Sequence, residues 1–175
     1  MNLVIDASVV IKFYIPEILS DKSAEVMSRV AAGELMLCAP DLLYPETGNI
    51  LWKKQCRHEL TPAEVDEIVD AITSLPIRIE SSMLVMPLAV SIAMHSGITV
   101  YDAMYVAVAR IYETRMITAD KKLMDALAKT EFKKYVQWLG TGDWGFREVL
   151  GEHFRLQTGH ERISRGLPRR ASLVQ

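Results

Sequence analysis

The stretch Leu3-Val4-Ile5-Asp6-Ala7-Ser8 decides the fold of this 175-residue chain. Its three consecutive aliphatic residues predict a strand that is buried on both faces, as in a parallel sheet. Asp6 falls where that strand ends, and helical sequence follows from Val9 to Tyr14. In open α/β sheets, ligands bind outside the carboxyl ends of the strands. A charged aspartate is tolerated there, especially opposite a cation, so Asp6 anchors a predicted carboxylate-lined metal site.

Strand-like and helical segments alternate along the rest of the chain. Strands are expected at residues 35–38, 77–80, 98–100, 115–118 and 135–139, and helices at residues 20–32, 41–58, 61–75, 83–95, 101–112 and 120–129. The helix after residue 60 has the clearest start, because Thr61-Pro62-Ala63-Glu64 is a capping box with proline at the first helical position. The alternation predicts an α/β fold with a central, mainly parallel sheet and helices on both faces.

Length and charge predict one domain followed by a segment of another kind. Half of the residues are apolar, which is enough for a sizeable core. Residues 1–145 carry 19 acidic and 14 basic side chains, whereas residues 146–175 carry three glutamates and six arginines. We therefore expect a domain over residues 1–145 and a C-terminal extension over residues 146–175, consisting of a short helix and a basic, mobile tail.

Several classes of protein are disfavoured by the sequence. Cys38 and Cys56 are too few and too far apart for a disulfide framework or a zinc knuckle. The longest apolar run, Met83 to Met94, is too short to span a bilayer. The chain opens directly into strand-like sequence, without the pattern of a secretory signal peptide. We expect a cytoplasmic protein that does not contact a membrane.

Four carboxylates are candidates for one metal site. Asp6, Asp102 and Asp120 each follow a predicted strand, and the carboxyl ends of parallel strands meet at one edge of a sheet. Glu46 lies on a predicted helix that covers the same edge. All-oxygen ligands of this kind suit Mg²⁺ or Mn²⁺. Such an ion orients an attacking water and neutralises phosphate charge, so phosphodiester hydrolysis is the reaction that this composition fits best.

Three polar residues are expected to hold a carboxylate or a water in place at this site: Ser8, Asn49 and Thr118. Each acid also has a structural alternative when it is taken singly. An aspartate after a strand most often caps the next helix, as Asp120 would for residues 121–129. Glu46 in the first turn of a helix would complement the helix dipole. A single shared site explains all four positions at once.

The candidate residues lie in four short stretches: Val4-Ile5-Asp6-Ala7-Ser8, Glu46-Thr47-Gly48-Asn49, Thr99-Val100-Tyr101-Asp102-Ala103-Met104-Tyr105-Val106-Ala107-Val108-Ala109 and Thr118-Ala119-Asp120-Lys121-Lys122-Leu123. Together these stretches resemble the signature of PIN-domain ribonucleases, and most closely that of the VapC-type toxins of prokaryotic toxin–antitoxin pairs. The resemblance covers residues 1–140 and implies a PIN-like α/β/α sandwich with Mg²⁺- or Mn²⁺-dependent endoribonuclease activity. It also implies a homodimer and inhibition by a cognate antitoxin. In that family the residues matching the four acids form the metal site, and those matching the three polar residues support it.

Basic residues near the predicted site are candidates for RNA contacts. Lys53 and Arg57 lie seven and eleven residues after Glu46, which places all three on one helix face. Lys12 and Lys121 follow two of the loops that carry the acids. Contacts between these cations and RNA phosphates would be electrostatic and largely independent of base sequence. The alternative for each cation is an ordinary solvated surface.

Three other functions compete with a metal-dependent endoribonuclease toxin. An aspartate phosphoacceptor domain also gathers aspartates around Mg²⁺, but it has no role for Glu46 or Asp102. A non-catalytic PIN-fold module that binds RNA or protein has no need of all four acids. A dinucleotide-binding enzyme is disfavoured because no glycine-rich turn follows Ile5.

Overall fold

The computed structural model describes residues 2–142, and the predicted C-terminal extension over residues 146–175 lies outside the described residues. Five short strands form one sheet: β1 (Asn2–Ile5), β2 (Met36–Pro40), β3 (Ile77–Glu80), β4 (Met116–Thr118) and β5 (Val136–Trp138). The strand order is β3-β2-β1-β4-β5, and all the pairs are parallel. The predicted parallel sheet is therefore confirmed, with β1 at its centre.

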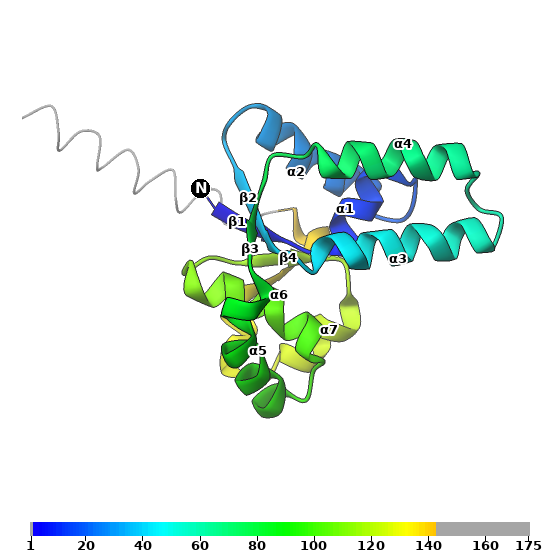
Figure 1. Cartoon of the computed structure of the whole chain (residues 1–175). Helices are drawn as coiled ribbons and strands as arrows, with labels where there is room; N and C mark the ends of the chain where they lie inside the picture. The colour runs from blue at the N-terminus through cyan, green and yellow to red at the C-terminus, as the bar shows by residue number, and fades with distance from the viewer. Residues whose placement is uncertain (1, 143–175) are drawn as a thin grey trace, which may run out of the picture. The chain divides into compact units, whose positions relative to one another are not determined.

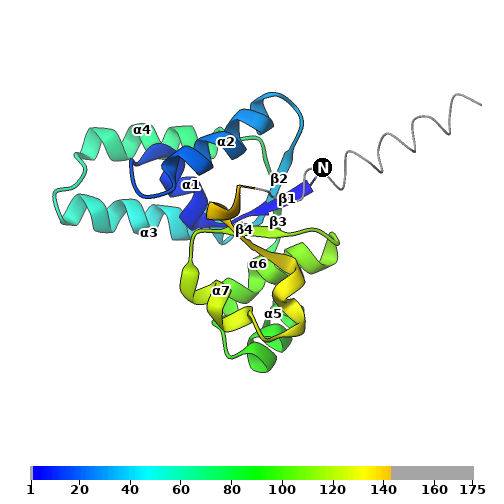
Figure 2. The same cartoon turned by 180° about the vertical axis from the view of Figure 1, so that it is seen from behind.

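Helices cover both faces of this sheet (Figures 1 and 2). One face carries α1 (Ala7–Tyr14), α2 (Ser20–Ala31), α3 (Leu43–Cys56) and α4 (Pro62–Thr73), and the other carries α5 (Ser82–Ser96), α6 (Val100–Ile111) and α7 (Lys121–Leu127). Two short 3₁₀ helices, η1 (Glu131–Tyr135) and η2 (Leu139–Thr141), flank β5. The arrangement is the predicted α/β/α sandwich.

The core is built around β1 and α6. Leu3, Val4 and Ile5 are fully buried, as expected for a central parallel strand with helices on both sides. In α6 every residue from 103 to 109 is buried, and α6 contacts β1, β2 and β4. Three of those residues are alanines, whose small side chains let the helix lie close to the sheet. This packing fixes the position of α6, which carries one of the predicted site acids.

The corner between α5 and α6 corrects one sequence prediction. No strand forms at residues 98–100. Instead α5 ends at Gly97, which has a left-handed φ of 68°, and Thr99 caps α6 by accepting a hydrogen bond from the backbone N–H of Asp102. The β-branched residues Ile98, Thr99 and Val100 favour a strand locally, but the cap at Thr99 starts a helix at the next residue. Asp102 therefore lies in the first turn of a helix and does not follow a strand.

None of the helices within residues 2–142 is by itself long and apolar enough to cross a membrane. Only α5 and α6 taken together reach that length and composition, and they are bent by 113° at their junction.

Candidate active site

Asp6 lies at the end of β1, where it is the N-cap residue of α1 and is only 9% exposed. Its Oδ2 atom accepts hydrogen bonds from Ser8 Oγ at 2.5 Å and from Thr118 Oγ1 at 2.6 Å. Burial raises the pKa of Asp6, the two hydroxyl donors lower it, and the nearby charges of Asp102 and Asp120 raise it further, so that the net shift is upward. Asp6 is thus a buried acid close to two other acids.

The two hydroxyls beside Asp6 also join the ends of β1 and β4. Ser8 Oγ accepts a hydrogen bond from the backbone N–H of Ala119 at 3.0 Å, and Thr118 Oγ1 accepts one from the backbone N–H of Asp120 at 2.9 Å. Each hydroxyl therefore accepts a hydrogen bond from a backbone N–H group and donates its own proton to the Asp6 carboxylate. The structure places Ser8 and Thr118 within hydrogen-bond distance of this carboxylate, and their supporting role remains a prediction.

Glu46 enters the site from the first turn of α3. Its Oε2 atom accepts a hydrogen bond from Tyr105 Oη at 2.6 Å. Partial burial raises the pKa of Glu46, the Tyr105 hydroxyl lowers it, and the charges of Asp6 and Asp102 raise it, with a net upward shift. Burial, followed by the charges of Asp6 and Glu46, raises the pKa of the Tyr105 phenol far above its ordinary value. The phenol therefore remains a proton donor at neutral pH.

The remaining two acids are held by helix-capping contacts. Asp102 Oδ2 accepts a hydrogen bond from Thr99 Oγ1 at 2.6 Å, in a capping arrangement with aspartate in the usual place of glutamate. Asp120 caps α7, because its Oδ1 atom accepts hydrogen bonds from the backbone N–H groups of Lys122 at 2.8 Å and Leu123 at 3.2 Å. The cap considered as an alternative for Asp120 is thus present, and it uses only one of the two carboxylate oxygens.

The four carboxylates share one pattern of contacts. One oxygen of each is held by hydroxyl or backbone N–H donors, which are neutral, and no ion pair joins any of them to a cation within residues 2–142. The second oxygen of each has no hydrogen-bond donor in the described part of the chain. Negative charge therefore gathers at the carboxyl edge of the sheet, and no ion pair from the described residues compensates it. A cation is the ligand that this charge favours.

The donor set fits a hydrated divalent ion such as Mg²⁺ or Mn²⁺. All four donors are carboxylate oxygens, which are hard ligands. No three Asp, Glu, His or Cys side chains within residues 2–142 are placed so that they could hold one metal ion together. Mg²⁺ retains several waters and commonly takes only one or two carboxylates from a protein, so an open set of acids suits it better than a closed cage. Asp6 and Glu46, whose charges repel each other directly, are the most buried candidates.

The predicted RNA contacts fall into two groups. Lys53, Arg57 and Lys121 are exposed. Arg57 and Lys121 lie 4.0 Å from Glu59 and 3.8 Å from Asp125, which are loose surface pairs. These three cations remain available to an anionic ligand.

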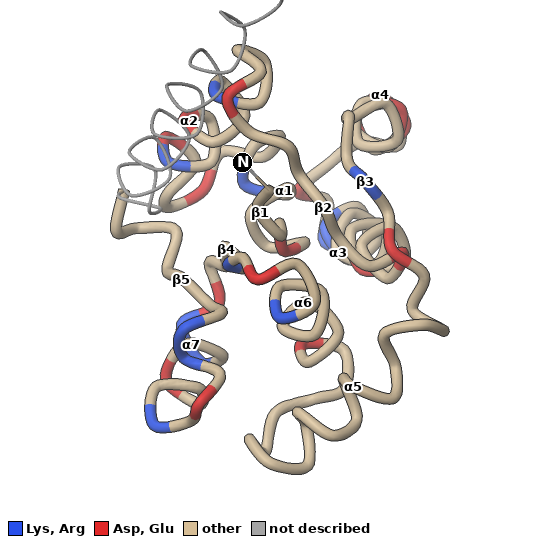
Figure 3. The backbone as a smooth tube through the Cα atoms, turned by 90° about the vertical axis from the view of Figure 1, so that its left-hand side faces the viewer, with Lys and Arg blue, Asp and Glu red and all other residues tan. Residues whose placement is uncertain are grey.

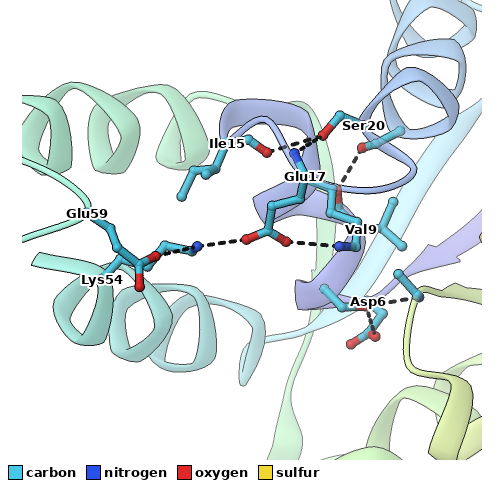
Figure 4. A network of polar contacts seen from close by, with 11 residues as sticks. Asp6, Val9, Ile15, Glu17, Ser20, Lys54 and Glu59 are labelled. Carbon is cyan, nitrogen blue, oxygen red and sulfur yellow. Dashed lines mark hydrogen bonds and ion pairs between the residues drawn. The ribbon is translucent and has the colours of Figure 1, made fainter. Parts of the chain in front are cut away.

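Lys12 is held by a different kind of contact. Its ammonium lies 2.9 Å from one carboxylate oxygen of Glu17. The other oxygen of Glu17 lies 2.7 Å from the ammonium of Lys54 (Figure 4). Lys54 also pairs with Glu59 at 3.1 Å. This network ties the connection between α1 and α2 to α3, and it lowers the pKa of Glu17 through its hydrogen bond with Lys54. Lys12 thus has a structural partner, which weighs against the predicted phosphate contact.

Asn49 lies one turn after Glu46 on α3 and is exposed. No hydrogen bond joins its side chain to any of the four acids among the described residues. Its supporting role remains a prediction.

Two residues of the site were missed from the sequence, Thr99 and Tyr105. Both lie three residues from Asp102, on opposite sides of it along the chain, and residues three apart share a helix face. The Thr99-x-x-Asp102 spacing is a variant of the capping box and was readable as such. Tyr105 lies within a run of apolar core residues. Its hydroxyl bonds to Glu46, which is distant in sequence, so the local sequence does not reveal this contact.

A parallel α/β/α sandwich with acids directly after β1, in α3 and α6, and directly before α7 defines a class of domain with an acidic, metal-compatible site. The family model described as "PIN domain" matches residues 3–130. The chain therefore belongs to the PIN-domain family.

Known proteins similar to the chain agree with this assignment. Ribonuclease VapC3 of Pyrobaculum aerophilum is 32% identical over 127 residues, which are 71% of this chain and 94% of that protein. The crystal structure of PAE2754 from the same organism has a TM-score of 0.59 at 22% identity and covers 81% of this chain and 85% of its own. VapBC2 from Rickettsia felis, bound to a DNA fragment from its promoter, has a TM-score of 0.56 at 10% identity and covers 79% and 98%. The two structures show similarity of fold.

Proposed function

We propose that the chain is a divalent-metal-dependent endoribonuclease that acts as the toxin of a toxin–antitoxin pair. One observation carries the proposal: four carboxylates lie near one another at one sheet edge, and each has one oxygen held by neutral donors and one oxygen to which no donor among residues 2–142 is bonded. The similarity to Ribonuclease VapC3 supports RNA as the substrate.

Asp6, Glu46, Asp102 and Asp120 are the proposed metal-site residues, of which one or two would bind the ion directly and the others would face its retained waters. A bound Mg²⁺ or Mn²⁺ ion would lower the pKa of an attacking water and offset the charge that develops on the phosphate. Ser8 and Thr118 keep Asp6 oriented by their hydrogen bonds, and the capping contacts of Asp102 and Asp120 orient those two acids. The reaction is the hydrolysis of an RNA phosphodiester bond, in which water adds to phosphorus and one ribose oxygen leaves.

Removing the metal ion tests this function directly. We expect the purified protein to cut a mixed pool of structured RNAs in Mn²⁺ or Mg²⁺ and to lose this activity in EDTA, by at least about 100-fold, with recovery when the ion is restored in excess. The products are followed on denaturing gels. A folded, metal-bound protein that cuts no RNA would contradict the proposal and favour a non-catalytic binding module.

The RNA backbone is proposed to run beside α3 and the start of α7. Lys53 and Arg57 extend along α3 from Glu46, and Lys121 follows Asp120, so these cations flank the acids at two sides. They supply positive charge where the acids themselves repel phosphate.

An antitoxin is the proposed protein partner, and the cytoplasm is the proposed compartment. The support for a partner comes from structural neighbours, which include VapBC2 and a toxin–antitoxin complex from Klebsiella pneumoniae. The latter has a TM-score of 0.53 at 12% identity.

A homodimer through α5 is part of the proposal. This helix carries no Asp, Glu, Lys or Arg, and Figure 3 shows it without a charged segment. Its exposed apolar residues are Met83, Leu84, Met86, Val90 and Met94. Exposed apolar patches without charge are typical of protein interfaces. A surface without charge can meet a second copy of itself around a twofold axis without repulsion.

A charge placed in the middle of this surface tests the dimer. Val90→Lys is expected to raise the dimer dissociation constant by about 100-fold, because the interface would have to bury an unpaired ammonium. Light scattering during size-exclusion chromatography over a dilution series measures it. Ile18→Lys is the matched control, since Ile18 is 85% exposed and lies between α1 and α2. A dimer that survives Val90→Lys, or that Ile18→Lys disrupts equally, would show that α5 is not the interface.

A further inference from the structure

The hydroxyl of Tyr105 is the one polar side-chain atom in the buried segment of α6 from residue 103 to residue 109. Tyr105 is only 1% exposed. A buried tyrosine hydroxyl requires hydrogen-bond partners, and a phenylalanine would fill the same space without that requirement. The hydrogen-bond partners of this hydroxyl therefore indicate what a tyrosine at residue 105 provides that a phenylalanine would not.

Those partners join two elements of the site. Tyr105 Oη donates to Glu46 Oε2 at 2.6 Å, and the backbone N–H of Ala7 lies close enough to this hydroxyl to lower its pKa slightly. Ala7 is the residue directly after Asp6, and Glu46 belongs to α3. The hydroxyl thus lies near the backbone beside Asp6 and is bonded to the side chain of Glu46.

Without a hydrogen-bond donor, the carboxylate of Glu46 would favour side-chain conformations that point away from the site. Its side chain has three rotatable bonds, it is only partly buried, and the charges of Asp6 and Asp102 repel it. The only hydrogen-bond donor that the described residues give to its carboxylate is Tyr105. The bond uses Oε2 and leaves Oε1 for another ligand.

We propose that Tyr105 is a positioning residue that holds Glu46 beside Asp6 and presents Glu46 Oε1 to the divalent ion. This inference rests on the proposed metal site and adds a residue to it. Hydrogen-bond partners of metal-binding side chains commonly change metal affinity by 10- to 100-fold when they are removed.

The test compares two tyrosines of α6 and its C-cap. Tyr105→Phe removes the hydroxyl at Glu46. Tyr112→Phe is the matched control, because the Tyr112 hydroxyl donates to a carboxylate oxygen of Glu80 at 2.5 Å, outside the proposed site. The Mn²⁺ dissociation constant of the RNA-free protein is measured by isothermal titration calorimetry at pH 7.5, and circular dichroism checks the fold.

We expect Tyr105→Phe to raise the Mn²⁺ dissociation constant by about tenfold and Tyr112→Phe to change it by less than about twofold. RNA cleavage by Tyr105→Phe is then expected to fall at limiting Mn²⁺ and to recover when Mn²⁺ is raised. Equal Mn²⁺ affinity of Tyr105→Phe and the natural protein would overturn the proposal, as would an equal loss in Tyr112→Phe.

A double-mutant cycle with Glu46→Gln separates positioning from a general loss of packing. If Tyr105 acts through Glu46, Tyr105→Phe has no further effect on Mn²⁺ affinity once Glu46 is glutamine. A full tenfold loss in that background would refute the proposed route. Because Mn²⁺ binding is measured without RNA, a protein that binds Mn²⁺ but cuts no RNA would refute the ribonuclease function and leave the role of Tyr105 standing.

Discussion

Asp6→Asn is expected to lower RNA cleavage by at least about 100-fold while making the metal-free protein more stable. The substituted amide keeps an oxygen that accepts the hydrogen bonds of Ser8 and Thr118, so the local geometry is retained. It removes the negative charge that the proposed metal ion requires. It also removes a buried charge that burial and neighbouring carboxylates disfavour, which is why the pKa of Asp6 is raised.

Cleavage rates and urea unfolding measured side by side on the same preparation check both halves of this prediction. Asp41→Asn is the control, since Asp41 follows β2 and is an exposed carboxylate that bonds to the hydroxyl of Ser82. It is expected to keep its activity within about twofold, as is usual for surface substitutions. If Asp6→Asn were less stable than the natural protein and equally active, Asp6 would be a structural residue and not a metal-binding residue.

The sequence predicted those parts of the site that depend on strand ends. Asp6 and Thr118 end adjacent parallel strands, so their proximity follows from the order of the chain and the parallel topology. Ser8 follows Asp6 by two residues, and its bond to Asp6 is local. These contacts were predictable because one element of secondary structure or one strand pairing brings the residues together.

The parts that were not predicted depend on packing between helices. The sequence predicts Asp102 after a strand because Ile98, Thr99 and Val100 have strand propensity, yet α5 ends at Gly97 and α6 begins at Val100. The bond between Tyr105 and Glu46 joins residues 59 positions apart on two helices, and no local pattern specifies it. The ion pair of Lys12 with Glu17 likewise depends on how the connection after α1 folds back toward α3.

The metal-free protein is expected to become more stable as the pH falls from 7.5 toward 5.5. Asp6 and Glu46 have pKa values above those of the unfolded chain, which lie near 4, so the folded state binds protons more tightly than the unfolded state. The free energy of unfolding then decreases as the pH rises through that window and is recovered as the pH falls. Glu17, whose pKa is lowered, has the opposite effect, but only below its ordinary value of 4.5.

Mn²⁺ is expected to stabilise the folded protein by binding the carboxylates in place of protons, and therefore to stabilise it most at the higher pH. A concentration 100-fold above the dissociation constant stabilises the folded state by about 2.7 kcal/mol, which corresponds to a rise in Tm of roughly 5–10 °C for a chain of this size. Thermal unfolding followed by circular dichroism at pH 7.5 and 5.5, in Mn²⁺ and in EDTA, measures both effects. The rise is expected to be smaller at pH 5.5, because protons compete with the ion for the same carboxylates.

Asp6→Asn separates this mechanism from general salt effects. The variant is expected to show a higher Tm than the natural protein in EDTA and a much smaller rise in Tm with Mn²⁺, because it lacks the negative charge of Asp6. An equal Mn²⁺ effect in both proteins would mean that the ion binds elsewhere. A metal-free Tm that falls between pH 7.5 and 5.5 would mean that the repulsion among the four acids is too weak to govern stability. The repulsion that destabilises the empty site is thus the same property that makes the site attract a divalent ion.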